Sequence, residues 1–343
     1  MKLAINTDIS RAIDFVRALS ILSVVFIHAR TGLVFESPLA EFFADALSRG
    51  IGALAVPAFF ILSGYLFGRH ELTFLSGMRR LANFLGIYIF WNAVVAGLVF
   101  LLLAVGVSPG PFLGGKFDGG IISVLGFDSL YPIAYQFWFI RELFLFTAFS
   151  IFIRLFVVQR IPIVFFHLVA LCIICFVFGE RTVVSSGAYI FGFLIAFLNF
   201  RAGFEVEHPV KFRVAFLVCL TIAGCVLFVM LLKPALVLMP IFLVFGLFAF
   251  FSGSYLLALT VRFRKSGQAL AASSFFVFAA HEPLLAAIKR LFHFLPAEAV
   301  YIIAPLLVVI FLLCIFFSLP KFVCMKFWFV FLGSPKRIAS VGI

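Results

Sequence analysis

The chain has 343 residues and the composition of a membrane protein. Hydrophobic residues make up 65% of it, charged residues make up 12%, and its mean hydropathy is +1.26. A soluble domain carries about 25% charged residues, so a water-soluble core is excluded. We expect residues 1–343 to form one transmembrane domain with no separate soluble domain. The net charge of +12 is explained by membrane topology and does not indicate nucleic-acid binding.

Apolar runs near the roughly 20 residues needed to cross a bilayer recur along the whole chain. They predict an all-α, polytopic membrane bundle of about ten transmembrane helices. The expected helices span residues 12–33, 51–68, 81–106, 135–157, 161–178, 184–200, 214–232, 236–260, 269–288 and 299–319.

The segments around the first two helices have distinct predicted roles. The polar N-terminus leads into an apolar run without an A-x-A-like cleavage site, which indicates a retained helix. The stretch from Glu36 to Arg49 is expected to form a short amphipathic helix at the outer interface. The loop of residues 107–134 is rich in Gly and Pro and is either a connector or a cover for a substrate entrance.

The basic residues indicate the orientation. If the N-terminus is cytoplasmic, 17 of the 26 Lys and Arg residues lie on the cytoplasmic side, 7 lie outside, and Arg17 and Arg141 lie within spans. The positive-inside rule therefore places both termini in the cytoplasm. The six cysteines lie in or beside apolar runs rather than in loops, which favours packing over disulfides. The sequence predicts no tightly bound cofactor and no metal.

Ionisable side chains within spans draw attention because each costs about 2.5–3.5 kcal/mol on insertion scales. The first helix carries Asp14, Arg17 and His28. His28 stands eleven positions after Arg17, which places the two within about 20° of one face and roughly 16 Å apart along the axis. Asp14 can pair with Arg17 across one turn. The alternative is that Arg17 is an interfacial anchor and His28 a core histidine.

Two later helices carry further polar groups. His281 follows an apolar run of the ninth helix, beside Glu282 and Pro283; it either faces the same interior as His28 or has a structural role. Arg141 and Glu142 follow Trp138 in the fourth helix. They either bind substrate or only lower each other's cost of burial.

At the start of the third helix, Arg79 and Arg80 are adjacent. They either grip an anionic donor such as the phosphates of coenzyme A, or reflect the positive-inside bias alone.

These segments together resemble the acyltransferase 3 family of integral membrane acyltransferases. The first helix is similar to the family's opening motif of Asp, Arg, ten residues and His. Asn83 and Gly86 stand near the places where the family often has a further Arg and a Pro. The matching residues are Asp14, Arg17, His28, Pro57, Phe59, Phe60, Ser63, Gly64, Tyr65, Arg79, Arg80, Trp138, Phe139, Ser274, Phe278, His281 and Pro283.

The resemblance implies a multi-pass protein of the bacterial inner membrane that works among membrane lipids. Its donor would be acetyl coenzyme A or another acyl coenzyme A, and its acceptor a hydroxyl of a glycan or lipid-linked saccharide. Arg17, braced by Asp14, would bind the donor with Arg79 and Arg80. His28 would act as general base or take the acyl group itself. Expected substrate contacts are Ser63, Tyr65, Trp138, Arg141, Glu142 and His281.

Two other functions fit parts of the pattern. Polar residues inside a many-helix bundle also mark the paths of transporters, so a flippase for a lipid-linked sugar is the main alternative. The sequence shows no broken-helix repeat in its favour. A catalytically idle membrane partner of a glycan synthesis complex would tolerate replacement of Arg17 and His28. Ser63 lacks the G-x-S-x-G context of a nucleophile, and helix packing is the alternative for it.

Overall fold

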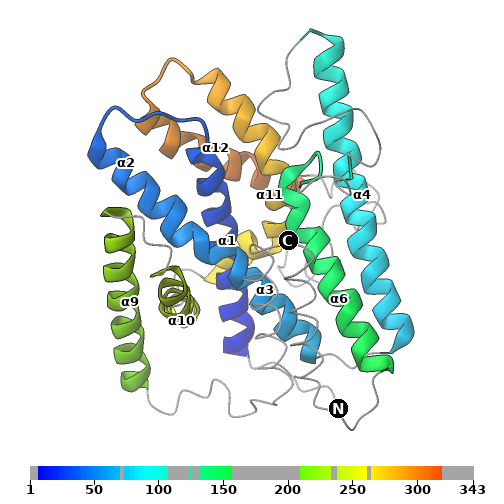
Figure 1. Cartoon of the computed structure of the whole chain (residues 1–343), viewed down its shortest axis with the longest axis vertical. Coiled ribbons are helices and arrows are strands. Elements are labelled where there is room, and N and C mark those ends of the chain that lie inside the picture. The colour runs from blue at the N-terminus through cyan, green and yellow to red at the C-terminus, as the bar shows by residue number, and fades with distance from the viewer. Residues whose placement is uncertain are drawn as a thin grey trace.

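The computed structural model describes residues 7–69, 73–106, 124–125, 131–156, 209–232, 238–260 and 264–318. These residues form a bundle of helices without a strand (Figure 1), which confirms the all-α prediction. Seven helical stretches in the described ranges are long and apolar enough to cross a membrane. The predicted helices at 161–178 and 184–200, and most of the loop at 107–134, lie outside the described residues.

The observed helices agree closely with the predicted runs. A π-helical turn joins α2 to α3, and a 3₁₀ turn precedes α6. The elements are α1 (Thr7–Arg30), α2 (Pro38–Asp45), the π turn (Ala46–Ile51), α3 (Gly52–Arg69), α4 (Phe74–Ala104), the 3₁₀ turn (Tyr135–Phe137), α6 (Trp138–Phe156), α9 (Pro209–Leu232), α10 (Met239–Ala258), α11 (Arg264–Leu291) and α12 (Ala297–Ser318).

Helix α1 is the central element of the bundle. It packs against α3, α10, α11 and α12 (Figure 1), and Ile21, Val25 and Ala29 are completely buried. The helices on several sides of α1 account for this burial. Helix α9 is the opposite case, because only 6% of its most apolar window is buried within the protein. Within the described part of the chain, α9 packs mainly against α10.

The turn after α1 leads into one long helical unit rather than two separate helices. Ser37 caps α2 by accepting from the N–H of Ala40, and Pro38 occupies the first turn, where its missing N–H has no helical partner in any case. The π turn then continues the helix into α3, so that residues 38–67 form a single candidate span. A Cβ on Gly52 would lie 2.5 Å from Ile27. Glycine therefore lets α3 approach α1 one residue before His28.

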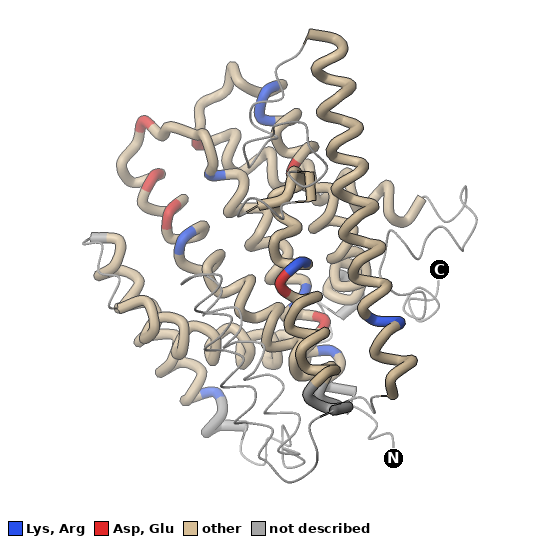
Figure 2. The backbone as a smooth tube through the Cα atoms, turned by 45° about the vertical axis from the view of Figure 1, so that its right-hand side comes forward, with Lys and Arg blue, Asp and Glu red and all other residues tan. Residues whose placement is uncertain are grey.

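Charged residues lie mainly towards the two ends of the bundle, with a smaller group inside it (Figure 2). At the end that carries His28, Arg30 bonds Glu41 at 3.0 Å and Asp45 at 3.1 Å, while Arg49 approaches Asp45 at 3.6 Å. Single surface ion pairs contribute little. This network joins the last residue of α1 to α2 and to the π turn.

Candidate active site

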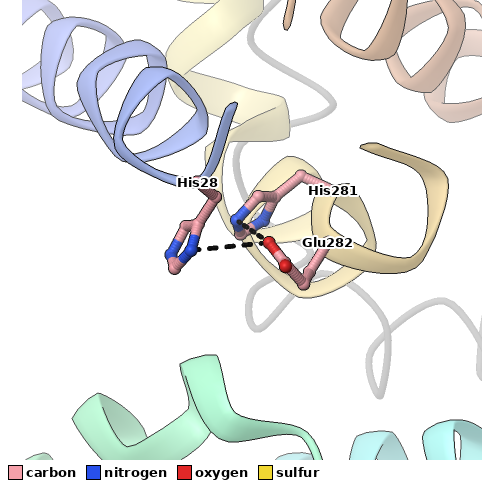
Figure 3. Close-up of side chains that lie close together, drawn as sticks. All are labelled: His28, His281 and Glu282. Carbon is pink, nitrogen blue, oxygen red and sulfur yellow. Dashed lines mark ion pairs between the residues drawn. The ribbon is translucent and has the colours of Figure 1, made fainter. Parts of the chain in front are cut away.

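His28, on the last turn of α1, meets side chains from two other parts of the chain. Its Nδ1 shares a short hydrogen bond with the phenol of Tyr135 and lies 3.4 Å from Oε2 of Glu282. Its ring centroid is 5.0 Å from that of His281. Figure 3 shows His28, His281 and Glu282 converging from α1 and α11. We call these three residues the histidine cluster.

Helix α11 holds His281 in one orientation. Its Nδ1 lies 2.6 Å from the carbonyl oxygen of Phe278 and 3.2 Å from that of Val277. A carbonyl only accepts hydrogen bonds, so Nδ1 is the donor, and in the neutral ring Nε2 carries the lone pair. Nε2 is buried without a hydrogen-bond partner among the described residues and lies 3.9 Å from Oε2 of Glu282.

Pro283 helps to place Tyr135. Proline has no N–H, so the carbonyl of Ala279 loses its usual partner four residues on. The side chain of Gln136 donates to that carbonyl at 3.3 Å. On the other side, the side-chain oxygen of Asn92 in α4 accepts from the N–H of Ala134 at 3.2 Å. The segment that carries Tyr135 is therefore held between α4 and α11.

Tyr135 is a neutral phenol at this position. The ordinary pKa of a tyrosine phenol is about 10, so the group keeps its proton near neutral pH; its hydroxyl also lies within hydrogen-bonding reach of the carboxyl of Glu282. A protonated phenol both donates and accepts. It can therefore donate to the carboxylate of Glu282 while it accepts from the Nδ1–H of His28.

Lys289 fixes the backbone at His28. Its Nζ donates to the carbonyl of His28 at 3.2 Å and to that of Thr31 at 2.9 Å. The last carbonyls of a helix lack partners within the helix, and a cation is favourable at that end. Through Lys289, α11 holds the same turn of α1 that its own His281 and Glu282 approach.

A cavity of about 460 Å³ lies towards the other end of α1, and side chains of α1, α3, α4, α6, α11 and α12 line it. Its polar lining residues are Arg17, Ser63, Arg80, Asn83, Thr147 and Ser274. The guanidinium of Arg80 also lies over the ring of Phe67, 5.5 Å from its centroid, a favourable cation–π position.

The cavity extends towards the histidine cluster. Phe278 lines it, and the ring of this residue lies 6.2 Å from that of His281. Phe278 therefore lies between the cavity that Arg17 and Arg80 line and the histidine cluster.

The predicted site residues differ in where the structure places them. The structure brings His28 and His281 together, and it places Arg17, Ser63 and Arg80 around the cavity. Asp14 lies one turn before Arg17 on α1, and its pairing with Arg17 stays a prediction. Five predicted site residues do not line this cavity in the described part of the chain: Arg79, Tyr65, Trp138, Arg141 and Glu142.

Those five residues have other surroundings. Arg79 is exposed, Glu142 is buried, and Arg141 is partly buried beside it on α6. Trp138 packs against the main core, and Tyr65 packs against a smaller core of α1 and α3. Substrate contacts by these residues stay predictions.

Sequence reasoning missed Tyr135 and Lys289 as site residues and considered Glu282 only as a neighbour of His281. Glu282 had a signal, because an acidic side chain in a span needs a partner or a task. Tyr135 had a weaker one, since Gln136 after it is a polar residue at the start of an apolar run. Lys289 looked like an ordinary basic residue at a membrane surface.

One family matches most of the chain. The sequence model of the acyltransferase 3 family, described as an acyltransferase domain, matches residues 10–320. No curated protein and no solved structure matches. The family match extends from the first turns of α1 to the end of α12 and includes both the cavity and the histidine cluster. The chain therefore belongs to the acyltransferase 3 family and is a multi-pass membrane acyltransferase.

Proposed function

We propose that the protein transfers an acetyl group from acetyl coenzyme A to a hydroxyl of a cell-surface polysaccharide or of its lipid-linked precursor. One observation carries the proposal. Helix α1 presents Arg17 to a cavity near one end and His28 to a cluster of polar groups near the other. A donor bound on one side of the membrane can thus react with an acceptor on the other.

The cavity suits the donor. Arg17 and Arg80 both line it, and guanidinium groups bind phosphates through paired, charge-assisted hydrogen bonds. Its wall towards the histidines includes Phe59, Phe139 and Phe278. An apolar passage accommodates the thin, uncharged pantetheine arm. That arm must cover roughly 16 Å, the separation of Arg17 and His28 along the helix axis.

The cluster suits proton transfer. Glu282 and Tyr135 together hold the proton on Nδ1 of His28, which leaves the lone pair on Nε2. Figure 3 shows that the second ring nitrogen of His28 lies on the side away from Glu282. In the Asp–His pairs of hydrolases, a carboxylate likewise orients the imidazole and stabilises its charged form.

The reaction then needs no group beyond these. Nε2 of His28 takes the proton of the acceptor hydroxyl as the hydroxyl oxygen forms a bond to the thioester carbonyl carbon. The carbon–sulfur bond breaks, and the proton passes to the sulfur of coenzyme A. The products are an O-acyl ester and free coenzyme A.

The acceptor assignment rests on orientation. The excess of Lys and Arg on the side of the N-terminus favours a cytoplasmic location for the Arg17 end. Acyl coenzyme A would enter from there, and His28 would face the outer side of the bacterial inner membrane. Glycans and their lipid-linked precursors are hydroxyl-rich acceptors found on that side.

The test compares the purified protein with its His28→Ala variant, with His293→Ala as the control. His293 is exposed beyond the last turn of α11. Labelled acetyl coenzyme A is supplied with candidate glycans, and label transfer and coenzyme A release are both followed. We expect His28→Ala to lose at least about 100-fold in rate and His293→Ala to keep the wild-type rate. Undiminished transfer by His28→Ala would contradict the proposal.

Two further readouts separate the alternatives. The first is whether the protein itself becomes labelled when no acceptor is present. Such labelling would show an acyl-histidine intermediate in place of the general-base route. Movement of a labelled lipid-linked sugar across vesicles without consumption of the acyl donor would favour the transporter.

A further inference from the structure

We propose that His28, His281 and Glu282 form a binding site for one divalent transition metal ion, for which Zn²⁺ is the probe, and that the bound ion blocks acyl transfer. The binding stands on the geometry of the histidine cluster alone. The block rests on the proposed function, because it assumes that Nε2 of His28 is the base.

The ligand atoms are already spaced for a metal. One nitrogen from each histidine and one carboxylate oxygen all lie within 4.8 Å of one another. Oε2 of Glu282 is 3.4 Å from Nδ1 of His28 and 3.9 Å from Nε2 of His281. A tetrahedral zinc with bonds of about 2.0–2.2 Å holds its ligand atoms roughly 3.3–3.5 Å apart. Small shifts of the side chains therefore close the site around an ion.

His281 has the arrangement of a metal ligand. Its Nδ1–H is bonded to backbone carbonyls of α11, and its fully buried Nε2 faces the cluster without a hydrogen-bond partner in the described part of the chain. Metal-bound histidines are held in the same way, with the second ring nitrogen donating to a carbonyl or carboxylate. A buried acceptor without a donor costs free energy, and a metal ion would satisfy this one.

The ligand set and charge point to a transition metal rather than Mg²⁺ or Ca²⁺, which prefer oxygen. Two imidazoles and one carboxylate match the three protein ligands of open zinc sites. Tyr135 or a water can take the fourth position. Lys289 bonds the carbonyl oxygens of His28 and Thr31 close by. Its positive charge favours an affinity below that of a closed structural zinc site.

The block follows from the protons of one imidazole ring. A neutral imidazole has one proton and one lone pair on its two nitrogens. When a metal binds Nδ1 of His28, the proton must move to Nε2. Nε2 then has no lone pair with which to accept the proton of the acceptor hydroxyl.

Zinc binding is measured on the intact protein in lipid nanodiscs, after removal of any affinity tag and of bound metal by a chelator. Competition with a chromophoric zinc chelator gives affinity and stoichiometry. We expect one equivalent for the wild type and at least about 10-fold weaker binding for His281→Gln. His293→Gln, which changes an exposed histidine near the end of α11, should bind as the wild type does. Thermal unfolding verifies that both variants are folded.

Cobalt gives an independent readout, because tetrahedral Co²⁺ absorbs visible light far more strongly than hydrated Co²⁺. We expect that absorption in the wild type and its loss in His281→Gln. Equal zinc binding by the wild type and folded His281→Gln, or no stoichiometric binding at all, would overturn the inference.

Activity separates this inference from the proposed function. We expect zinc to inhibit transfer and a chelator to restore it. Suppose that the wild type is active, that His28→Ala is not, and that the wild type binds no zinc. This result overturns the metal site and leaves the proposed function intact. Stoichiometric binding without inhibition overturns the block and the role of Nε2 as base.

Discussion

At the scale of single residues, the environment of His28 explains how a polar ring is tolerated near the end of an apolar helix. Its Nδ1 meets the phenol of Tyr135 and the carboxyl of Glu282. Both partners come from other elements, the 3₁₀ turn before α6 and helix α11. The burial cost of a polar group in a membrane is reduced when such groups satisfy one another. Under the proposed function, the same contacts determine which nitrogen of His28 faces the substrate.

The first prediction concerns Glu282. Glu282→Gln keeps the shape of the side chain but removes the negative charge that stabilises the imidazolium of His28 during proton transfer. We expect kcat to fall by about 100-fold with little change in the KM for acyl coenzyme A. Steady-state release of coenzyme A measures both constants. The control is Glu41→Gln, whose side chain is 54% exposed; a wild-type kcat in folded Glu282→Gln would rule out the role given to Glu282.

At the scale of helices, α11 organises the site. It supplies His281 and Glu282, leaves the carbonyl of Ala279 open to Gln136 through Pro283, and sends Lys289 to the end of α1. The three effects fall within three turns of one helix. Because Pro283 has no N–H, the carbonyl of Ala279 is free to accept a hydrogen bond from a neighbouring segment. A helix without the proline would not offer this carbonyl.

The second prediction concerns Lys289. Lys289→Met keeps most of the side chain but removes the bonds to the carbonyls of His28 and Thr31. We expect a loss of about 1–2 kcal/mol in stability, together with a lower kcat because the backbone of His28 is less well held. Thermal unfolding in detergent and the coenzyme A assay report the two effects.

The control for Lys289 is Arg290→Met. Arg290 is the next residue and is exposed, so its removal changes the local charge by the same amount without breaking the contacts at His28. If both variants lose the same stability and rate, charge alone explains the effect and the anchoring role of Lys289 is wrong.

The helices themselves could be predicted well from the sequence, because a membrane span is specified by local composition. The run predicted at 299–319 is α12, Ala297–Ser318, and the one predicted at 81–106 is the main part of α4, Phe74–Ala104. The join between α2 and α3 could not be predicted. Polar and charged residues between Glu36 and Arg49 suggested a separate interfacial helix, whereas capping by Ser37 and the π turn produce one continuous unit.

The site could be predicted only in part. Arg17 and His28 share one helix, so their spacing alone gives their common face. The approach of Tyr135 and Glu282 to His28 depends on how the 3₁₀ turn and α11 pack against α1, over separations of more than 100 residues. Such contacts leave no periodic signal in the sequence. For the same reason, the sequence could not distinguish the roles of Arg79 and Arg80. The packing of the helices places only Arg80 at the cavity.

At the scale of the whole molecule, the cavity is lined by residues of six helices and gives the third prediction. Arg80→Gln removes a guanidinium from its wall, whereas Arg79→Gln removes an exposed one. Loss of a charge-assisted contact to phosphate corresponds to about 1.5–3 kcal/mol. We therefore expect the KM for acyl coenzyme A to rise at least about 10-fold in Arg80→Gln, with the KM for the acceptor unchanged.

Arg79→Gln is the matched control, since the net charge of the membrane surface falls by the same amount. An equal rise of the donor KM in both variants would show that the surface potential, rather than the cavity, attracts the donor.

The central place of α1 has a consequence for how the protein is made. This helix leaves the ribosome before α10, α11 and α12, but it packs against all three, and His28 and His281 are separated by more than 250 residues of chain. At about 5–20 residues per second, α11 is synthesised roughly 10–50 seconds later. During that interval the side chain of His28 does not yet have its partners His281 and Glu282 from α11. A chaperone or insertase that shields a half-made bundle would therefore act on this helix first.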